Sequence, residues 1–193
     1  MEQDKTRSPQ LIDQYGRLHT YLRISLTERW NLRCRYCMPE NGVPLQPVAD
    51  LLTSCEIIQA TKLFARSGIT RIRSTGGEPL LQRDLIELVI QLKAIQGIQS
   101  IEITTNGMTL EKKLVALQRA GIDRVNISLD TLTPDKSRHL TRRQGVAKVM
   151  KSIEKAQALG FHPLKINCVV QRHFNLDELV EFVAFTEKCG VDV

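Results

Sequence analysis

Two cysteines, Cys34 and Cys37, are separated by two residues and follow a predicted strand directly. Residues 21–26 alternate apolar with polar side chains, which favours a buried strand. Thiolates presented at the end of a strand, with the aromatic Tyr36 between them, are typical of a metal centre at the mouth of a barrel. A half zinc site is the alternative, but no second Cys or His pair stands at usable spacing. The loop is therefore expected to hold a metal centre.

Two further patterns could bind a ligand. Gly-Gly-Glu-Pro at 76–79 follows a second predicted strand, and backbone without side chains can approach a ligand closely. Taken alone, it could equally be a strand-ending turn. Arg73 and Lys165 adjoin Ile72 and Ile166 on predicted strands, where ordinary solvated surface is a poorer explanation. Basic side chains of this kind suit phosphate groups.

The elements that must position these residues alternate along the chain. After the strand at 21–26, an irregular segment is expected at 38–52, and Thr53 with Glu56 forms a capping box that begins a helix. Strand and helix pairs are then predicted at 70–74 and 83–95, 100–104 and 109–119, 125–129 and 146–159, and 164–169 and 176–188. This alternation predicts parallel strands with helices on the outside. Residues 191–193 begin a sixth strand that is cut short, and residues 1–20 are interpreted as a polar lead-in.

Chain length, net charge and cysteine content limit the kinds of partner and compartment that suit this sequence. The 193 residues suit one core, and the net charge of +6 suits a triphosphate ligand or a merely soluble basic protein. Like-charge runs that would suggest a nucleic-acid arm are missing, and no stretch reaches the roughly 18 apolar residues of a membrane span. Five cysteines with one close pair indicate a reduced compartment. We expect an intracellular, cytoplasmic protein, or a mitochondrial matrix protein if a transit peptide is missing.

Five sequence blocks in order resemble radical S-adenosylmethionine (SAM) enzymes and, more narrowly, the GTP 3',8-cyclase family of molybdenum cofactor biosynthesis. They are LRISLTERWNLRCRYCMPE from residue 22, RIRSTGGEPLLQRD at 71–84, ITTNG at 103–107, NISLDTL at 126–132 and KINCVV at 165–170. The resemblance runs from about residue 14 to residue 193. It implies an α/β fold, a partial (β/α)6 TIM-type barrel or radical SAM core over 21–193, incomplete in its sixth strand.

Residue by residue, the resemblance implies three sets of contacts. Those to a [4Fe-4S] cluster match Cys34 and Cys37, those to SAM match Tyr36, Gly77 and Ser128, and those to GTP match Arg23, Arg73, Thr104 and Lys165. The implied reaction converts GTP to (8S)-3',8-cyclo-7,8-dihydroguanosine 5'-triphosphate through a 5'-deoxyadenosyl radical, with an electron donor as a further partner. A homodimer is a further possibility.

The sequence departs from the family pattern at its first cluster ligand. The Cys-x3-Cys-x2-Cys loop places a cysteine at position 30, where this chain has Trp30, and neither Cys168 nor Cys189 is expected to replace it. The family's C-terminal region with a second cluster is absent, and Ser74 replaces an aliphatic residue. We therefore expect impaired or absent cyclase activity. The alternatives are a non-catalytic SAM- or nucleotide-binding module and another radical SAM enzyme.

Overall fold

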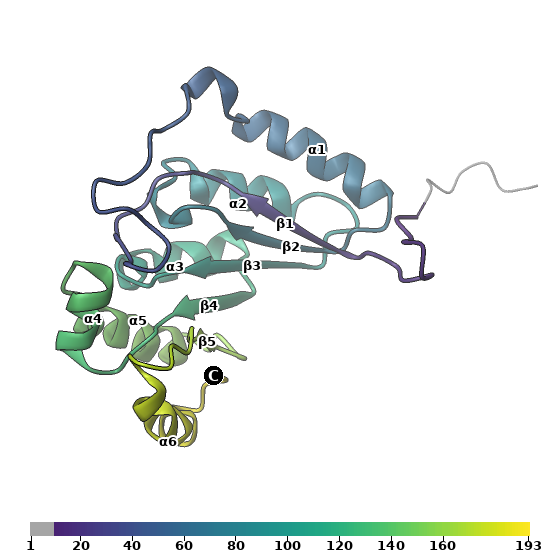
Figure 1. Cartoon of the computed structure of the whole chain (residues 1–193). Helices are drawn as coiled ribbons and strands as arrows, with labels where there is room; N and C mark the ends of the chain where they lie inside the picture. The colour runs from purple at the N-terminus through teal and green to yellow at the C-terminus, as the bar shows by residue number, and fades with distance from the viewer. Residues whose placement is uncertain (1–9) are drawn as a thin grey trace, which may run out of the picture.

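A computed structural model describes residues 10–193, so the first nine residues of the expected lead-in lie outside it. From residue 10 the lead-in forms a turn at 13–16, where Ile12 and Leu18 make an isolated antiparallel bridge. Five parallel strands then form one sheet in chain order (Figure 1). Their bounds are β1 Tyr21–Ser25, β2 Arg71–Thr75, β3 Ser100–Thr105, β4 Arg124–Ser128 and β5 Lys165–Asn167. The α/β class with parallel strands is confirmed.

The helices follow the strands as the alternation predicts. They are α1 Ser54–Arg66, α2 Leu85–Lys93, α3 Leu110–Ala120, α4 Pro134–Thr141, α5 Val146–Ala158 and α6 Leu179–Cys189, with short 3-10 turns at Val48–Asp50, Pro79–Leu81 and Leu176–Glu178. The capping box of Thr53 and Glu56 is present at the start of α1. The predicted helix at 176–188 is divided, since its first turn is 3-10. Helix α4 was not predicted from the sequence, although Thr133 followed by Pro134 is a helix-start signal.

The hydrophobic core lies between the sheet and the helices that cover one of its faces. In Figure 1, α2, α3 and α5 lie behind the sheet, and the face toward the viewer carries no helix. Strand residues such as Ile72, Ile103 and Ile127 are fully buried on the covered side. The predicted stripe on α2 packs there too, through Leu85, Leu88, Val89 and Leu92. No helix of the described residues is long and apolar enough to cross a membrane.

Strand register places polar side chains in rows across the uncovered face, here called the open face. The first row is Arg23, Arg73, Glu102 and Arg124, which are successive partners from β1 to β4. The second row is Thr104, Asn126 and Lys165, which are partners from β3 to β5. Because alternate residues of a strand share a face, these rows lie about two residues, or roughly 7 Å, apart.

The C-terminal edge of the sheet is shorter than predicted. The strand expected over 164–169 is three residues long, and the sixth strand is present only as a parallel bridge between Lys165 and Asp192. The amide of Ile166 donates to the carbonyl of Asp192 at 2.7 Å, and the amide of Asp192 donates to the carbonyl of Leu164 at 3.0 Å. The sheet is therefore an open, partial barrel.

Candidate functional site

The loop after β1 carries both predicted cluster ligands into one cavity. This rim cavity, of about 180 Å³, lies at the carboxyl ends of the strands. Its lining includes Trp30, Cys34, Tyr36, Cys37, Ser128 and Asp130. Two predicted SAM contacts, Tyr36 and Ser128, are thus brought together with the two thiols. The Tyr36 hydroxyl donates to Asp130 Oδ2 at 3.0 Å.

The two thiols differ in their exposure. Cys37 is exposed, and Cys34 is partly buried, where its carbonyl accepts hydrogen bonds from the amides of Cys37 and Met38 at 3.2 and 2.9 Å. Burial raises the pKa of the Cys34 thiol to about 12, and the neighbouring Cys37 contributes to the increase. A metal ligand must be a thiolate, so a bound cation is what would stabilise the charged form here.

Neighbouring elements fix the course of the cysteine loop. The amides of Arg33 and Arg35 donate to carbonyls at the end of α4, those of Thr141 and Leu140, at 3.1 and 2.9 Å. From the other side, Nδ2 of Asn106 donates to Oδ1 of Asn31 at 2.6 Å. No role was predicted for Asn106 or Asp130, although Asn106 directly follows β3 and Asp130 stands two residues after the end of β4, where functional side chains concentrate.

The glycine pair beneath the loop serves a packing role in the structure. A Cβ at Gly77 would lie 2.1 Å from the carbonyl oxygen of Arg29, and Gly76 has φ +125°. The amide of Gly77 donates to the carbonyl of Thr27, and that of Glu78 to the carbonyl of Arg29. Gly77 is buried and does not line the rim cavity, so its predicted contact with SAM stays a prediction.

The side chain of Glu78 connects the glycine turn to β3. It is 1% exposed, and its carboxylate accepts hydrogen bonds from Thr105 Oγ1 at 2.6 Å and from the amides of Asn106 and Leu80 at 2.9 and 3.1 Å. Burial raises the pKa of this carboxyl, while the hydrogen bonds act in the opposite direction. The glycine turn, β3 and, through Asn106, the cysteine loop are therefore connected.

The donor set at the rim does not fit a cluster held by three thiolates. Trp30, 41% exposed, lines the cavity where the family pattern has a cysteine, and an indole offers no thiolate. Cys168 instead packs against the core, with Sγ 3.6 Å from the carbonyl oxygen of Asp130. Between residues 10 and 193, no group of three His, Cys, Asp or Glu side chains could hold a metal ion. Two thiols are what this rim provides.

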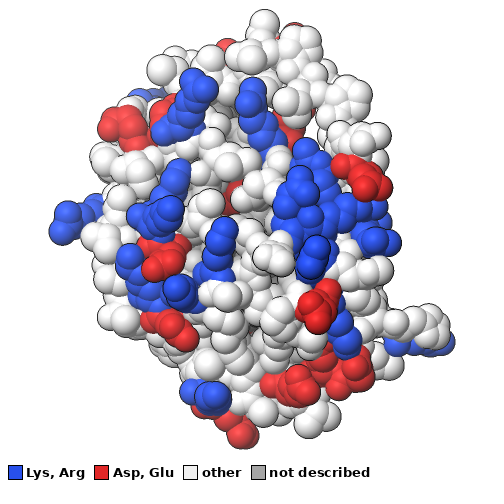
Figure 2. Space-filling model, turned by 90° about the vertical axis from the view of Figure 1, so that its left-hand side faces the viewer, with Lys and Arg blue, Asp and Glu red and all other residues white. Residues whose placement is uncertain are grey.

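The surface around the rim is basic. Figure 2, which looks onto the end of the molecule where the strands terminate, shows Lys and Arg side chains gathered in several groups. Arg35, Arg138 and Arg142 line one hollow there, together with Asp135 and His139. The four histidines of the chain are exposed.

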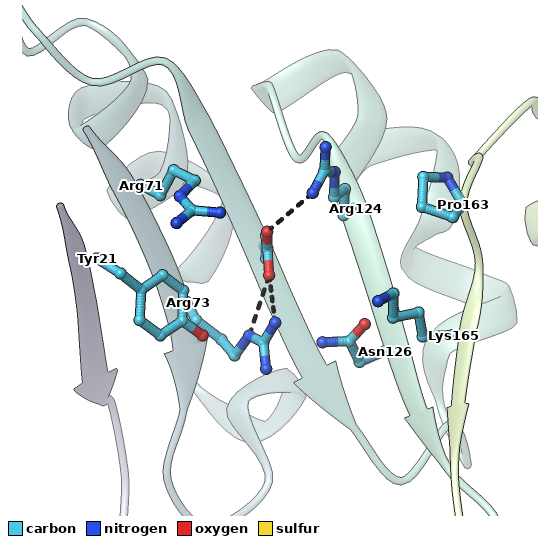
Figure 3. A pocket seen from close by; sticks show the side chains of 8 residues that line it. Tyr21, Arg71, Arg73, Arg124, Asn126, Pro163 and Lys165 are labelled. Carbon is cyan, nitrogen blue, oxygen red and sulfur yellow. Dashed lines mark hydrogen bonds and ion pairs between the residues drawn. The ribbon is translucent and has the colours of Figure 1, made fainter. Parts of the chain in front are cut away.

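A second cavity lies on the open face, farther from the cysteine loop. This floor pocket, of about 380 Å³, is lined by Tyr21, Arg71, Arg73, Glu102, Arg124, Asn126, Pro163 and Lys165. Figure 3 shows the labelled side chains projecting from the sheet on the side away from the helices. The guanidinium groups of Arg71 and Arg73 lie 5.7 and 5.3 Å from the ring centroid of Tyr21.

The four predicted GTP contacts lie on the open face in adjacent rows. Arg23 pairs in register with Arg73, and Thr104 and Lys165 both pair in register with Asn126. Arg73 and Lys165 line the floor pocket, whereas Arg23 and Thr104 do not. The buried Oγ1 of Thr104 has no hydrogen-bond partner in the described part of the chain. Sequence reasoning missed Tyr21, Arg71, Glu102 and Arg124, whose proximity depends on strand register.

Comparison with known proteins gives a consistent result. The model of the Radical SAM superfamily matches residues 24–186. Molybdenum cofactor biosynthesis protein 1 of Bos taurus is 55% identical over 95% of this chain and 29% of its own length. The mitochondrial GTP 3',8-cyclase of Arabidopsis thaliana is 52% identical over 98% of this chain and 49% of its own length. The GTP 3',8-cyclase of Limosilactobacillus fermentum is 47% identical over 95% of this chain and 55% of its own length. The chain thus spans about a third to a half of these relatives.

Solved structures agree on the fold. Streptococcus suis SuiB has a TM-score of 0.70 at 21% identity, covering 90% of this chain and 38% of SuiB. The structure of anSMEcpe with bound AdoMet has a TM-score of 0.66 at 21% identity, covering 87% of this chain and 48% of that one. At this identity the likeness establishes the architecture alone.

Proposed function

The chain belongs to the radical SAM superfamily, and we propose that residues 21–193 form the core domain of a GTP 3',8-cyclase. Membership of the superfamily implies a [4Fe-4S] cluster and SAM as cofactors. The proposed substrate is GTP, and the proposed step is the first of molybdenum cofactor biosynthesis. The names and identities of the relatives support this assignment.

One observation carries the assignment of the substrate site. Arg23, Arg73, Thr104 and Lys165, which the family resemblance implies as GTP contacts, share one face of the sheet in two neighbouring rows. We assign the phosphates of GTP to the floor pocket, where Arg73 and Lys165 would donate charge-assisted hydrogen bonds. Thr104 belongs to the same face, although its Oγ1 is buried and does not line the pocket.

The rim cavity is the proposed site of SAM. Ser128 would donate to the SAM carboxylate, and Tyr36 would lie beside the adenine with its ring fixed by the hydrogen bond to Asp130. Cys34 and Cys37 share this cavity, which is the placement that SAM bound to a cluster would require. We propose that Gly77 acts at this site through its contact with the cysteine loop.

The incomplete donor set limits the chemistry that follows. With Trp30 in place of a thiolate, we derive no radical step for this chain and propose that its cyclase activity is impaired or absent. This same residue favours a second candidate function, a module that binds SAM or a nucleotide without forming radicals. A homodimer and a mitochondrial location, as in the name of the Arabidopsis relative, complete the proposal, with an electron donor as a further partner if the chain is active.

Calorimetric titration of GTP tests the substrate site. We expect Arg73→Gln and Lys165→Gln each to weaken GTP binding by roughly tenfold or more, since each removes a charged hydrogen-bond donor. Lys151→Gln on α5 is the matched control, because this exposed lysine lies on a helix of the opposite face. Equal binding by all four proteins would refute the site. Equal affinity for ATP and GTP in the wild type would favour another radical SAM enzyme or a general nucleotide module.

A further inference from the structure

Glu102 is the one acidic residue among those that line the floor pocket in the described part of the chain. Its side chain is 4% exposed, in the middle of the row formed with Arg73 and Arg124. Nε and Nη2 of Arg73 donate to Oε2 of Glu102 at 3.0 and 2.5 Å. Nη1 of Arg124 lies 3.6 Å from Oε1 (Figure 3). The Glu102 carboxylate therefore already accepts from the Arg73 guanidinium, which would otherwise be available to a ligand in the floor pocket.

The charges of the pocket explain why such a carboxylate is needed. Four cations and one carboxylate line the pocket, leaving an excess of three positive charges. Like charges directly opposite each other across neighbouring strands are destabilising, and Arg23 and Arg73 are such a pair. Glu102 lies next to Arg73 on the following strand and offsets this repulsion while the pocket is empty.

We propose that Glu102 is the counter-ion of the empty floor pocket and that a phosphate group of the ligand takes its place on Arg73. A phosphate presents more charge and more acceptor oxygens than a carboxylate, so it competes with Glu102 for the Nε and Nη2 donors of Arg73 more strongly than a singly charged anion does. Glu102 thereby makes the pocket selective for phosphate groups. The inference rests on the proposed function only in taking the floor pocket as the phosphate end of the ligand.

The test compares Glu102→Gln with the wild type in calorimetric titrations of inorganic tripolyphosphate and of GTP. Glu154→Gln is the control, since it makes the same change of charge at an exposed position of α5. We expect Glu102→Gln to bind tripolyphosphate roughly tenfold tighter, because it removes a competing negative charge within a few ångströms of the ligand. Without ligand it should unfold at a lower temperature than the wild type. If both tripolyphosphate and GTP bind, the phosphate chain that they share is the group recognised. If GTP binds more tightly than tripolyphosphate, its nucleoside makes an additional contact.

A second substitution locates the effect at Arg73. In an Arg73→Gln background, Glu102→Gln should produce a much smaller gain in tripolyphosphate affinity, because the two side chains act as a pair. If Glu102→Gln does not fold, NMR of the arginine Nε–H groups in the wild type provides the test. The Arg73 signal, identified by its loss in Arg73→Lys, should shift when tripolyphosphate saturates the pocket.

The outcomes separate this inference from the proposed function. Unchanged or weaker tripolyphosphate binding by Glu102→Gln, or an Arg73 signal that stays unmoved at saturation, overturns the role of Glu102. GTP binding that still depends on Arg73 and Lys165 would then leave the proposed function intact. Absence of binding of both ligands by the wild type and by Glu102→Gln would overturn both proposals.

Discussion

Replacing each of two fully buried serines by alanine should change the stability of the protein in opposite directions. Ser74 on β2 and Ser152 on α5 are both 0% exposed. The Oγ of Ser74 has no hydrogen-bond partner in the described residues. The Oγ of Ser152 donates to the carbonyl of Gly107 at 2.8 Å and accepts from the amide of Glu111 at 3.0 Å. We predict that Ser74→Ala stabilises the protein and that Ser152→Ala destabilises it.

The magnitudes follow from the burial of the hydroxyl groups. An unpaired buried hydroxyl costs about 1–3 kcal/mol. Ser74→Ala removes that cost, and the small void it leaves offsets well under about 1 kcal/mol. The net gain in unfolding free energy is then about 1–2 kcal/mol, which for this chain length raises Tm by roughly 2–8 °C. Ser152→Ala leaves the half-buried amide of Glu111 without this partner and removes one of the two hydrogen bonds that the buried carbonyl of Gly107 accepts, at a cost of about 1–3 kcal/mol.

Urea denaturation of the wild type and both variants provides the measurement. The midpoint should rise for Ser74→Ala and fall for Ser152→Ala, with similar slopes for all three proteins. A loss of more than about 0.5 kcal/mol in Ser74→Ala would show that its hydroxyl is paired in solution, and the reasoning would fail. The two positions lie on different elements, so the double variant should show the sum of the two effects.

Three further substitutions test the glycine turn, the buried Glu78 carboxylate and the start of α1. Gly77→Ala should lower the free energy of unfolding by more than about 2 kcal/mol in urea denaturation, because its Cβ collides with the Arg29 carbonyl. For the same reason, thiol reagents should modify Cys34 faster in this variant. An unchanged midpoint would contradict this packing. Because burial raises the pKa of Glu78 in the folded state, its contribution to stability falls as pH rises from the unfolded value through the folded one. The stability difference between wild type and Glu78→Gln should therefore decrease over that interval, and a difference independent of pH would refute the shift. Thr53→Ala should cost about 1 kcal/mol, measured by thermal unfolding, through loss of the capping box; no loss would mean that the box is absent in solution.

Much of the architecture was predictable because it depends on local patterns. The capping box at Thr53 and the apolar stripe of α2 are signals within a few residues, and both are present in the structure. The missed helix α4 is short and strongly polar, with only Ser137 and Leu140 buried, so its hydrophobic period is weak. The shortening of β5 to three residues and the reduction of the sixth strand to a bridge depend on neighbouring segments that periodicity does not describe.

The site was less predictable because its contacts join distant parts of the chain. Asn106 and Asn31 are 75 residues apart, and Arg73 and Glu102 are 29 apart, so register and loop geometry decide whether they meet. The family resemblance indicated Arg73, but it gave no sign that a carboxylate would already occupy its guanidinium. For Gly77, the sequence suggested a ligand contact, whereas the structure places the Arg29 backbone against it.

The iron content after anaerobic reconstitution tests most directly whether this radical SAM core lacks one cluster ligand. We predict that the wild type retains far less than the roughly four irons per chain of a complete cluster, and that Trp30→Cys approaches that value with the matching visible absorption. Trp30→Ser is the control, since it removes the indole without adding a thiol. A full complement of iron in the wild type, or no increase in Trp30→Cys over Trp30→Ser, would contradict the account.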